Sequence, residues 1–315
     1  MSSSSQRTTR AGQGSGGGPA ARVALVTGGA GFLGLHLCER LAAEGWTVHA
    51  TSRSARGPTP GIRWWAADLA DLEAARALLD AVKPELVFHL AGAVTGAQEA
   101  SLVHATHHSH ATSALNLLSL LAGRSVQRLV LTGTLLEPAG AVETAVPSSP
   151  YGAAKLVSAL YARMFFRYFS APVVVARPFV TYGPRQHPDK VLPYVIRSLL
   201  RGEAPRLGNG DWRADWVYVD DVIEGLLRAG TRPGLEGAEI DLGSGQLVPL
   251  RDLVLRIGGL LAAPDRIRFG ELGDRRDAPE RAADVATAKR LLGWEPCVSL
   301  EEGLRRLIAW HRAQP

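Results

Sequence analysis

Residues 23–34 read VALVTGGAGFLG, and this short stretch decides the fold. It begins with an apolar run typical of a buried strand, and a helical pattern of leucines follows it. Glycines stand between the two, at positions 28, 31 and 34. The first permits a tight turn, the second lets the backbone approach a bound phosphate, and the third lets the helix pack on the strand. The stretch therefore predicts a phosphate-binding turn that leads into a helix N-terminus.

Short apolar strands alternate with helical patterns in the residues that follow. Such alternation is typical of a parallel sheet covered by helices on both faces. Predicted strands span residues 23–27, 47–51, 62–65, 86–90, 129–132 and 173–176, and predicted helices begin near Leu33, Leu72, His104 and Tyr151. We therefore predict an α/β fold, namely a doubly wound parallel Rossmann sheet with a smaller C-terminal substrate lobe.

Three parts of the chain differ in pattern. Residues 1–20 are rich in Ser, Gly and Arg and are expected to form a disordered tail. Residues 21–185 carry the strand–helix alternation and are expected to form an NAD(P)-binding Rossmann domain. Residues 186–315 lose this regularity and are expected to form mainly a substrate-binding lobe, from which a segment near 215–245 returns to the Rossmann domain.

Composition excludes several classes of protein. The chain has 315 residues, of which 46% are hydrophobic and 21% charged, as in an ordinary globular protein. Its two cysteines, Cys38 and Cys297, argue against a disulfide framework and favour a reducing, cytoplasmic setting. No apolar run approaches the ~20 residues of a membrane span, so no membrane partner is expected. The net charge of +5 is not gathered into a Lys/Arg stripe with aromatic residues, so no nucleic-acid partner is expected.

The end of the second strand bears on the choice of cofactor. NAD-specific sites usually place an acidic side chain there, whereas the 2′-phosphate of NADP needs a cation instead. Residues 50–54 read ATSRS, with no acid and with Arg53 in reach; Arg56 is close behind. The segment favours NADP(H), with NAD(H) as the alternative if Arg53 is a solvated loop residue. Asp68 and Leu69, after the third strand, are suited to a place beside the adenine ring.

Tyr151 and Lys155 stand four residues apart, on one face of a helix that begins after Pro150. A free tyrosine, with a pKa near ~10, is a poor acid–base catalyst at neutral pH. A fixed cation beside it, together with a positive nicotinamide ring, would stabilise the phenolate. Thr134, at the end of the fifth strand, offers a hydroxyl to the same substrate oxygen. The pattern predicts proton transfer that accompanies hydride transfer, against the alternative of a surface helix pair.

Further motifs follow in a fixed order along the chain. They are Asp68-Leu69, residues 89–92 (HLAG), residues 132–134 (TGT), Tyr151 with Lys155, Arg177-Pro178 leading to residues 182–184 (YGP), residues 215–221 (DWVYVDD) and residues 291–296 (LLGWEP). With the glycine turn, this set resembles the extended short-chain dehydrogenase/reductase family, which includes nucleotide-sugar epimerases, dehydratases and ketosugar reductases. The likeness runs from about residue 22 to residue 312.

The resemblance implies a catalytic triad of Thr134, Tyr151 and Lys155 and a carbohydrate substrate. It also implies a homodimer that pairs the helices at His104 and Tyr151. The cofactor-binding residues expected from the turn, the pair and the resemblance together are Gly28, Gly31, Phe32, Leu33, Gly34, Ser52, Arg53, Asp68, Leu69, Leu90, Ala91, Gly92, Thr132, Tyr151, Lys155 and Pro178. The expected substrate-binding residues are Thr134, Val180, Arg185, Arg213 and Arg276.

Departures from the family pattern concern the substrate. Members that bind a nucleotide diphosphate usually have Arg where this chain has Ala214, and a second Arg near Glu271 and Leu272. Each lost charge-assisted contact costs ~1.5–3 kcal/mol. Either Arg213 and the arginines at 275 and 276 substitute, or the substrate carries no diphosphate. The usual strand-to-loop Asn appears as Val180, and the usual helical Asn as His110.

Three other groups of residues are candidates for a functional role. His104, His107, His108 and His110 crowd one helix, but no carboxylate or cysteine completes a shell, so no metal is expected. Asp220 and Asp221 are expected to have a structural role, because adjacent side chains diverge. Trp212 is the one tryptophan considered as a sugar contact, although burial is the usual fate of large aromatics.

Four readings of the function stay open. The first is an NADPH-dependent reductase of a keto-sugar, in which the sugar is nucleotide-linked and Tyr151 supplies the proton. The second is an NAD-dependent nucleotide-sugar epimerase or dehydratase. The third is a reductase of a non-nucleotide carbohydrate in natural-product biosynthesis. The fourth, from another class, is a non-catalytic module that senses NADP(H), although such modules usually lose the Tyr or the Lys.

Overall fold

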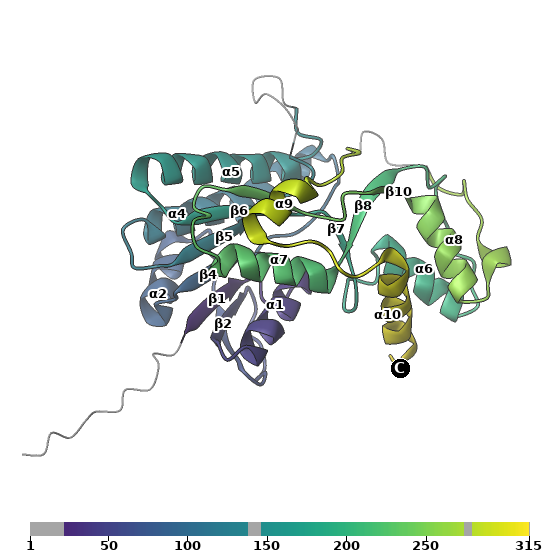
Figure 1. Cartoon of the computed structure of the whole chain (residues 1–315), viewed down its shortest axis with the longest axis horizontal. Coiled ribbons are helices and arrows are strands. Elements are labelled where there is room, and N and C mark those ends of the chain that lie inside the picture. Colours follow the sequence, from purple (N-terminus) through teal and green to yellow (C-terminus); the bar gives the residue numbers. More distant parts are fainter. Residues whose placement is uncertain (1–21, 138–145, 274–278, 315) are drawn as a thin grey trace, which may run out of the picture.

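A central sheet of seven parallel strands dominates the molecule (Figure 1). The computed structural model describes residues 22–137, 146–273 and 279–314, so the expected N-terminal tail lies outside the described residues. The sheet has the order β3-β2-β1-β4-β5-β6-β9. Its strands are β1 (Val23–Thr27), β2 (Thr47–Ser52), β3 (Ile62–Ala66), β4 (Leu86–His89), β5 (Arg128–Thr132), β6 (Val173–Pro178) and β9 (Glu239–Leu242). The order reverses between β1 and β4, which confirms the predicted doubly wound Rossmann sheet.

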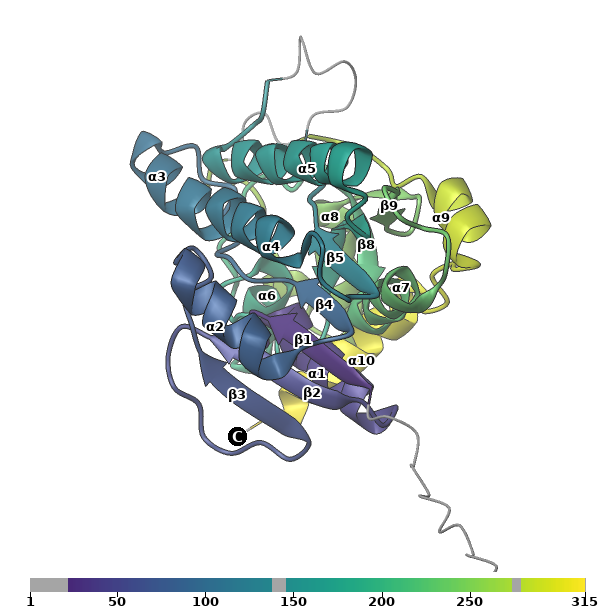
Figure 2. The same ribbon diagram turned by 90° about the vertical axis from the view of Figure 1, so that its left-hand side faces the viewer.

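Helices cover both faces of this sheet (Figure 2). One face carries α1 (Phe32–Ala43) and α7 (Val219–Thr231), and the other carries α2 (Leu72–Val82), α4 (Ser113–Leu121) and α5 (Pro150–Phe169). Alternate residues of a strand therefore enter different cores: Ala24 and Val26 pack toward α1, whereas Leu25 packs toward α2. Burial on both faces explains why the strands read as continuous apolar runs.

The smaller lobe lies at the right of Figure 1. It contains a second sheet, in the order β10-β8-β7. The lobe's elements are β7 (Val180–Tyr182), α6 (Val191–Leu200), β8 (Arg213–Tyr218), β10 (Leu247–Pro249), α8 (Leu250–Leu260), a short 3-10 helix (Pro264–Arg266) and α10 (Leu300–Arg312). Of the segment expected to return to the Rossmann sheet, α7 and β9 do so, but β8 pairs with β7 and β10. Helix α9 (Val285–Leu292) packs beside β9.

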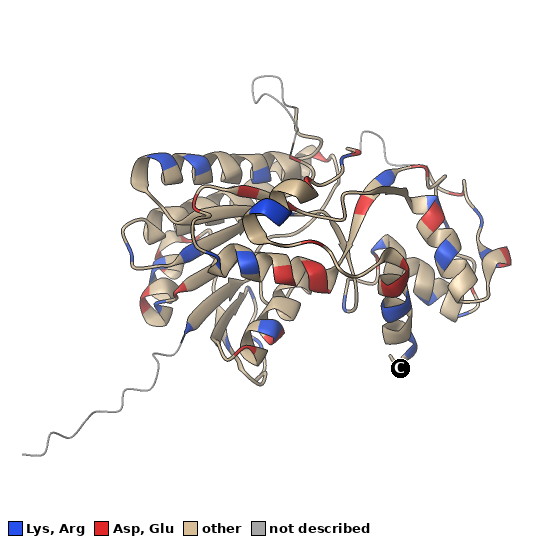
Figure 3. Ribbon diagram, viewed as in Figure 1, with Lys and Arg blue, Asp and Glu red and all other residues tan. Residues whose placement is uncertain are grey.

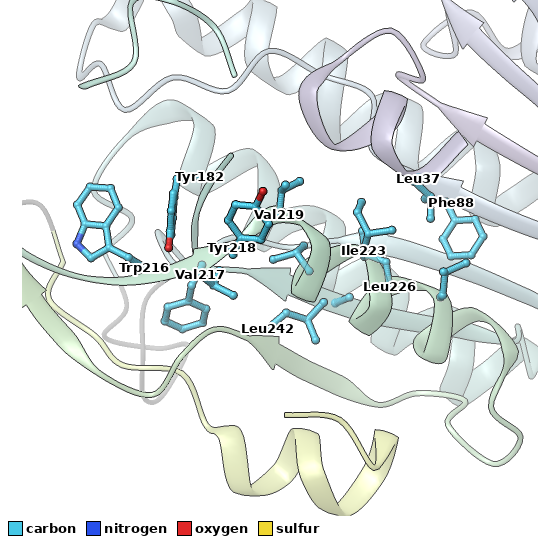
Figure 4. Packing of buried hydrophobic residues seen from close by; sticks show 14 of the residues in the cluster. Leu37, Phe88, Tyr182, Trp216, Val217, Tyr218, Val219, Ile223, Leu226 and Leu242 are labelled. Carbon is cyan, nitrogen blue, oxygen red and sulfur yellow. The ribbon is translucent and has the colours of Figure 1, made fainter. Parts of the chain in front are cut away.

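One hydrophobic core runs from the lobe into the sheet without a break. Figure 4 shows Trp216 and Tyr218 of β8 near one end and Phe88 of β4 at the other, with α7 side chains such as Ile223 between them. All of these side chains belong to a single buried cluster. Because the interior of a protein is packed as densely as an organic crystal, a shared core fixes the lobe against the sheet.

The helix expected from His104 is not one regular α-helix. A 3-10 turn (Ala100–Leu102) leads into α3 (Val103–Thr106), then a π-helix spans His107–Thr112, and α4 follows without a gap. The wider π turn changes which residues face inward, and it buries His110 while His107 and His108 stay exposed. Such π segments occur often at functional sites.

Charged residues of both signs are interspersed over both lobes (Figure 3). On α10, for example, Arg305 pairs with Glu301 and Arg306 pairs with Glu302, four residues apart in each case. Exposed pairs of this kind contribute little to stability, so they are features of a solvated surface. Within the described parts of the chain, no helix is both long enough and apolar enough to cross a membrane.

Candidate active site

The glycine turn has the shape that the sequence predicts. Gly28 has a φ of +67°, and a Cβ there would lie 2.7 Å from the Ala91 Cα. A Cβ on Gly34 would lie 2.2 Å from the Gly28 carbonyl oxygen, so α1 can approach β1 this closely because position 34 is glycine. At Gly31 a Cβ would meet the Gly28 oxygen alone, at 3.2 Å, among the described residues. The turn thus leaves open the space that a pyrophosphate needs at the N-terminus of α1.

The tip of β2 carries no carboxylate. Ser52 is buried, and its hydroxyl donates to the carbonyl of Ser54 at 2.5 Å. Arg53 is exposed, and in the described part of the chain no ion pair engages it. Asp68 is also exposed, accepts a hydrogen bond from the Ala70 amide and lies 3.7 Å from His108 Nε2. This edge therefore presents the cation and the carboxylate in separate places.

The carboxyl ends of β4 and β5 are tied together by hydrogen bonds. The Thr132 hydroxyl donates to the His89 carbonyl at 2.9 Å, and the Ala91 amide donates to the Thr27 hydroxyl at 3.2 Å. Leu90 and Ala91 are half-buried and follow directly on β4, beside the glycine turn. These contacts hold the segment after β4 against the turn, where a dinucleotide would lie across it.

Tyr151, Lys155 and Thr134 come together as the sequence predicts. Helix α5 begins at Pro150, and Ser149 caps it by accepting a hydrogen bond from the Gly152 amide at 3.1 Å. The hydroxyls of Thr134 and Tyr151 are hydrogen-bonded to each other. The Lys155 ammonium donates to the Thr132 carbonyl at 2.7 Å and lies 6.0 Å from the centre of the Tyr151 ring. All three side chains are at least nine-tenths buried.

Burial sets the protonation of this group. It raises the pKa of Tyr151 to about 12, although the hydrogen bond with Thr134 acts in the opposite direction. Burial lowers the pKa of Lys155 to about 8, and the negative charge of Glu137 opposes this shift. At neutral pH the phenol therefore carries its proton and the amine is charged. This is the state in which a tyrosine can donate a proton.

His110 stands where the family pattern has Asn, and its ring lies edge-on to Tyr151 at 5.0 Å. Its Nε2 donates to the Ala93 carbonyl at 3.0 Å, which leaves Nδ1 as the unprotonated nitrogen. Nδ1 is buried and has no partner among the described residues. Burial, followed by the charge of Lys155, lowers the pKa of His110 to about 3, so the ring stays neutral. The ring also fills the space beside Gly92, whose φ is +124°.

Sequence reasoning missed an ion pair directly behind Thr134. Glu137 Oε1 accepts the Thr134 amide at 2.7 Å, and Glu137 Oε2 accepts from Arg177 Nε at 2.9 Å. The two residues are 40 positions apart, on different elements, and no local spacing links them. Arg177 was noted for its place in a motif alone. The sequence shows only an acid three residues after Thr134; neither its burial nor its partner is visible there.

A dinucleotide fits this arrangement. The glycine turn provides a cradle that a Cβ at position 28 or 34 would fill, and α1 begins there with no acidic residue in its first turn. Lys155 and Tyr151 stand beyond it, at the carboxyl edge of the same sheet. The residues present are therefore those that would hold the phosphates, the ribose and the nicotinamide of such a cofactor.

Comparison with known proteins decides the family. Residues 24–243 match the family model described as NAD dependent epimerase/dehydratase family. The chain belongs to the NAD-dependent epimerase/dehydratase family. This confirms the resemblance found in the sequence, and it makes the protein a relative of enzymes that act on nucleotide sugars.

Curated and solved members of this epimerase/dehydratase family cover nearly the whole chain. UDP-glucose 4-epimerase of Mycolicibacterium smegmatis is 31% identical over 311 residues, which are 91% of this chain and 98% of the relative. The structure of UDP-glucose 4-epimerase of Thermotoga maritima with UDP-glucose has a TM-score of 0.81 and 28% identity, and covers 92% and 98% of the two chains. UDP-glucuronic acid 4-epimerase of Bacillus cereus, with UDP-glucuronic acid and NAD, has a TM-score of 0.77 and 26% identity, and covers 92% and 99%.

The predicted substrate residues of this family member are less well gathered. Val180 opens β7 and is half-buried against the core. Arg185, with a φ of +65°, pairs with Glu39 of α1 at 2.6 Å and is therefore engaged at the surface. Arg213 is exposed and its neighbour Ala214 is buried, and successive side chains of a strand point to opposite faces. Arg213 thus points away from the side that Ala214 faces and does not take its place. Arg276 lies outside the described residues.

Two remaining residues, Asp221 and Trp212, make contacts within the fold. Asp221 is buried and accepts the amides of Cys297 and Val298, which ties the C-terminal segment to α7. Trp212 stacks edge-on against Trp216, and its Nε1 has no partner among the described residues. No three His, Cys, Asp or Glu side chains of the described ranges are grouped to hold a metal ion.

Proposed function

We propose that the protein is an NADPH-dependent reductase of a keto-sugar, with the sugar linked to a nucleotide. One observation carries the proposal: the Tyr151 hydroxyl is buried, protonated and hydrogen-bonded to Thr134, next to the Lys155 ammonium. These two hydroxyls are hydrogen-bonded to each other, so both can bind the same substrate oxygen. The dinucleotide, when bound, would supply the hydride.

Each of the three side chains has a defined task in this reaction. Thr134 orients the carbonyl oxygen of the sugar, and Tyr151 donates the phenol proton to it as the carbonyl carbon is reduced. Lys155 stabilises the phenolate that forms, because its ammonium lies 6.0 Å from the centre of the Tyr151 ring. A reduced nicotinamide is uncharged, so Tyr151 keeps its proton until the substrate takes it. A protonated Tyr151 beside an uncharged nicotinamide suits reduction of a carbonyl better than oxidation of an alcohol.

Support for NADPH comes from the tip of β2. A site for the NAD ribose usually has a carboxylate there, and this chain has Ser52 and the exposed Arg53. A guanidinium forms strong paired hydrogen bonds with phosphate. The solved relative from Bacillus cereus contains NAD, so NADP preference would distinguish this chain from it.

Epimerisation with bound NAD is the second candidate, because the M. smegmatis relative is a 4-epimerase at 31% identity. Dehydration has less support. It needs additional groups that remove a proton from carbon and protonate the leaving hydroxyl. The positions after Thr134 are Leu135 and Leu136, and the next acid, Glu137, is held by Arg177. The homodimer expected from the sequence stays a prediction, and the exposed Phe166 and Phe169 of α5 are consistent with it.

Purified protein tests the proposal directly. We expect it to oxidise NADPH in the presence of a nucleotide-linked keto-sugar, and to carry no tightly bound NAD after gel filtration. The Tyr151→Phe variant should bind NADPH normally and lose turnover by a factor of about 10³. Tyr161→Phe, on the same helix, is the matched control and should keep full turnover.

Two outcomes would contradict the proposal. Unchanged turnover in Tyr151→Phe would remove the proton donor. Retained NAD, together with turnover that needs no added nicotinamide, would establish the epimerase instead. If free keto-sugars are reduced as well as nucleotide-linked ones, the carbohydrate carries no recognised nucleotide, as the loss of Arg at Ala214 allows.

A further inference from the structure

We propose that Glu137 is a positioning residue of this site: its carboxylate holds Thr134 against Tyr151, and its negative charge acts on the Lys155 ammonium, which is hydrogen-bonded to Thr132 two residues before Thr134. The inference deepens the proposed function, because it rests on the roles given there to Thr134 and Tyr151. None of the sequence motifs includes Glu137. Its side chain is only 3% exposed, an unusual position for a carboxylate.

Glu137 contacts the backbone of Thr134 directly. Glu137 Oε1 accepts the Thr134 amide at 2.7 Å, which is short for an N–H···O bond and typical of an ionised acceptor. The Glu137 amide in turn donates to the Thr134 carbonyl at 3.2 Å. Glu137 thus binds both the backbone amide and the backbone carbonyl of Thr134. Because the backbone is held, the Thr134 side chain is held as well, in contact with the Tyr151 hydroxyl.

Arg177 fixes the carboxylate itself. Arg177 Nε donates to Glu137 Oε2 at 2.9 Å, so each oxygen of the carboxylate has its own partner. The same guanidinium also contacts Glu239, and Asp241 lies 3.7 Å from its Nη1. Arg163 pairs with Glu239 in turn. Glu137 is therefore one end of this charge network, and among the described residues it is the acid of the network that bonds to Thr134.

Gly133 shows that the local backbone is built around this pair. A Cβ at that position would lie 2.6 Å from Glu137 Oε1 and 2.6 Å from Arg177 Cγ. The Gly133 amide donates to the Ala176 carbonyl at 2.7 Å, which keeps the segment in the β5–β6 register. A side chain at 133 would push the carboxylate away from Thr134. Glycine here serves the close approach of the ion pair to the strand.

The charge of Glu137 also acts on Lys155. Burial of Lys155 favours the neutral amine, and Glu137 is the group that opposes this by raising the pKa of Lys155. Other titratable groups face the same space: His89 on β4 and His110 on the π-helix are both buried and neutral. Arg177 faces Glu137 from β6. Among these groups Glu137 carries the negative charge that Lys155 needs.

A substrate-free titration tests the inference. The chain has four lysines, so isotope-labelled lysine gives few signals in NMR, and Lys155→Arg assigns the one that matters. In Glu137→Gln we expect the pKa of Lys155 to fall by about one unit, the size expected for loss of a nearby opposite charge. Glu239→Gln is the matched control: it also takes one anion from Arg177, and should leave the pKa of Lys155 unchanged.

A second variant separates position from charge. Glu137→Asp keeps the charge, but it is shorter by one methylene and cannot span Thr134 and Arg177 together. We expect a Lys155 titration close to wild type and faster hydrogen exchange at the Thr134 amide. If Glu137→Gln does not fold, Glu137→Gln with Arg177→Gln removes both buried charges and permits the same titration.

A wild-type Lys155 titration in folded Glu137→Gln would overturn the inference, and so would an equal shift in Glu239→Gln. Protection of the Thr134 amide in Glu137→Asp at the wild-type level would overturn the positioning role. Failure to oxidise NADPH with every keto-sugar would contradict the proposed function and leave these measurements unaffected, since they need neither substrate nor cofactor.

Discussion

Arg53 shows how much a single side chain can decide at the tip of a strand. It extends from β2 into solvent, and the buried Ser52 before it leaves no carboxylate at the place where NAD sites usually have one. Its guanidinium forms no ion pair with any of the described residues. A bound 2′-phosphate would provide one.

Replacement of this residue tests the cofactor choice. In Arg53→Ala we expect the affinity for NADPH to fall by about 10- to 100-fold, because a charge-assisted hydrogen bond contributes ~1.5–3 kcal/mol. NADH lacks the 2′-phosphate, so its affinity should change little. Arg76→Ala, an exposed α2 arginine beside Glu73, is the control. Fluorescence titration would measure the affinity of each variant for NADPH and for NADH. Equal losses of affinity for the two nucleotides in Arg53→Ala would contradict a phosphate contact.

At this scale the sequence was informative where chemistry follows local spacing. Tyr151 and Lys155 lie one turn of a helix apart. Gly28, Gly31 and Gly34 lie within seven consecutive residues, from the loop after β1 into the start of α1. The sequence pattern alone therefore places both groups correctly. The bond between Glu137 and Arg177 joins residues of different elements, and nothing in the spacing reveals it. Arg185 was predicted to face the substrate, but it pairs with Glu39, a partner 146 positions away.

Helix α5 is the element that presents both proton-transfer residues. Ser149 caps its N-terminus, and the buried Ser149 side chain accepts a hydrogen bond from the Gly152 amide. Tyr151 stands in the first turn, where a helix frays most easily without a cap. The cap therefore secures the part of the helix on which the phenol sits.

Loss of the cap should have two effects. In Ser149→Ala we expect the free energy of unfolding to fall by ~1 kcal/mol, as for other helix caps, and NADPH turnover to fall as well. Ser299→Ala removes the equivalent cap from α10, whose Ser accepts the Glu302 amide at 3.3 Å. That control should lose similar stability with no loss of turnover. Urea unfolding and a turnover assay on both variants would decide, and equal turnover in the two would contradict the role of the first turn.

The elements themselves were predicted well where their period was regular. The six predicted strands, β1 to β6, start and end within two residues of their predicted bounds. The helix near His104 was the exception, because part of it, His107–Thr112, is a π-helix, and the wider turn leaves no mark in the composition. Likewise, no pattern in the sequence shows that β8 belongs to the small sheet, whereas β9 belongs to the large sheet and α7 packs on it.

Stability of the whole molecule should depend on pH on the acid side. The pKa of His110 falls from 6.5 to about 3 on folding, and the pKa of His89 also falls well below its usual value. The unfolded chain then binds more protons than the folded one between pH 3 and 6.5, so stability is lost as pH decreases through that window. At pH 5 the loss from His110 alone is about 2 kcal/mol.

Urea unfolding at pH 7 and pH 5 measures this loss. His110→Gln should reduce the difference between the two conditions, because it removes one of the groups that must ionise. His107→Gln, at an exposed position of the same π-helix, should leave the difference as in the wild type. An identical pH dependence in all three proteins would contradict the assignment of a neutral, buried His110.

The edge strand β9 has a consequence for how the chain is made. Its residues, 239–242, pair with β6, which ends at residue 178. During translation, the ribosome must add some sixty residues after β6 before the partner of that strand exists. Throughout this interval the nascent chain presents the Val-rich run of β6 as an open edge, which is a template for aggregation. Recombinant production should therefore respond to slower synthesis and to chaperones that bind extended apolar segments.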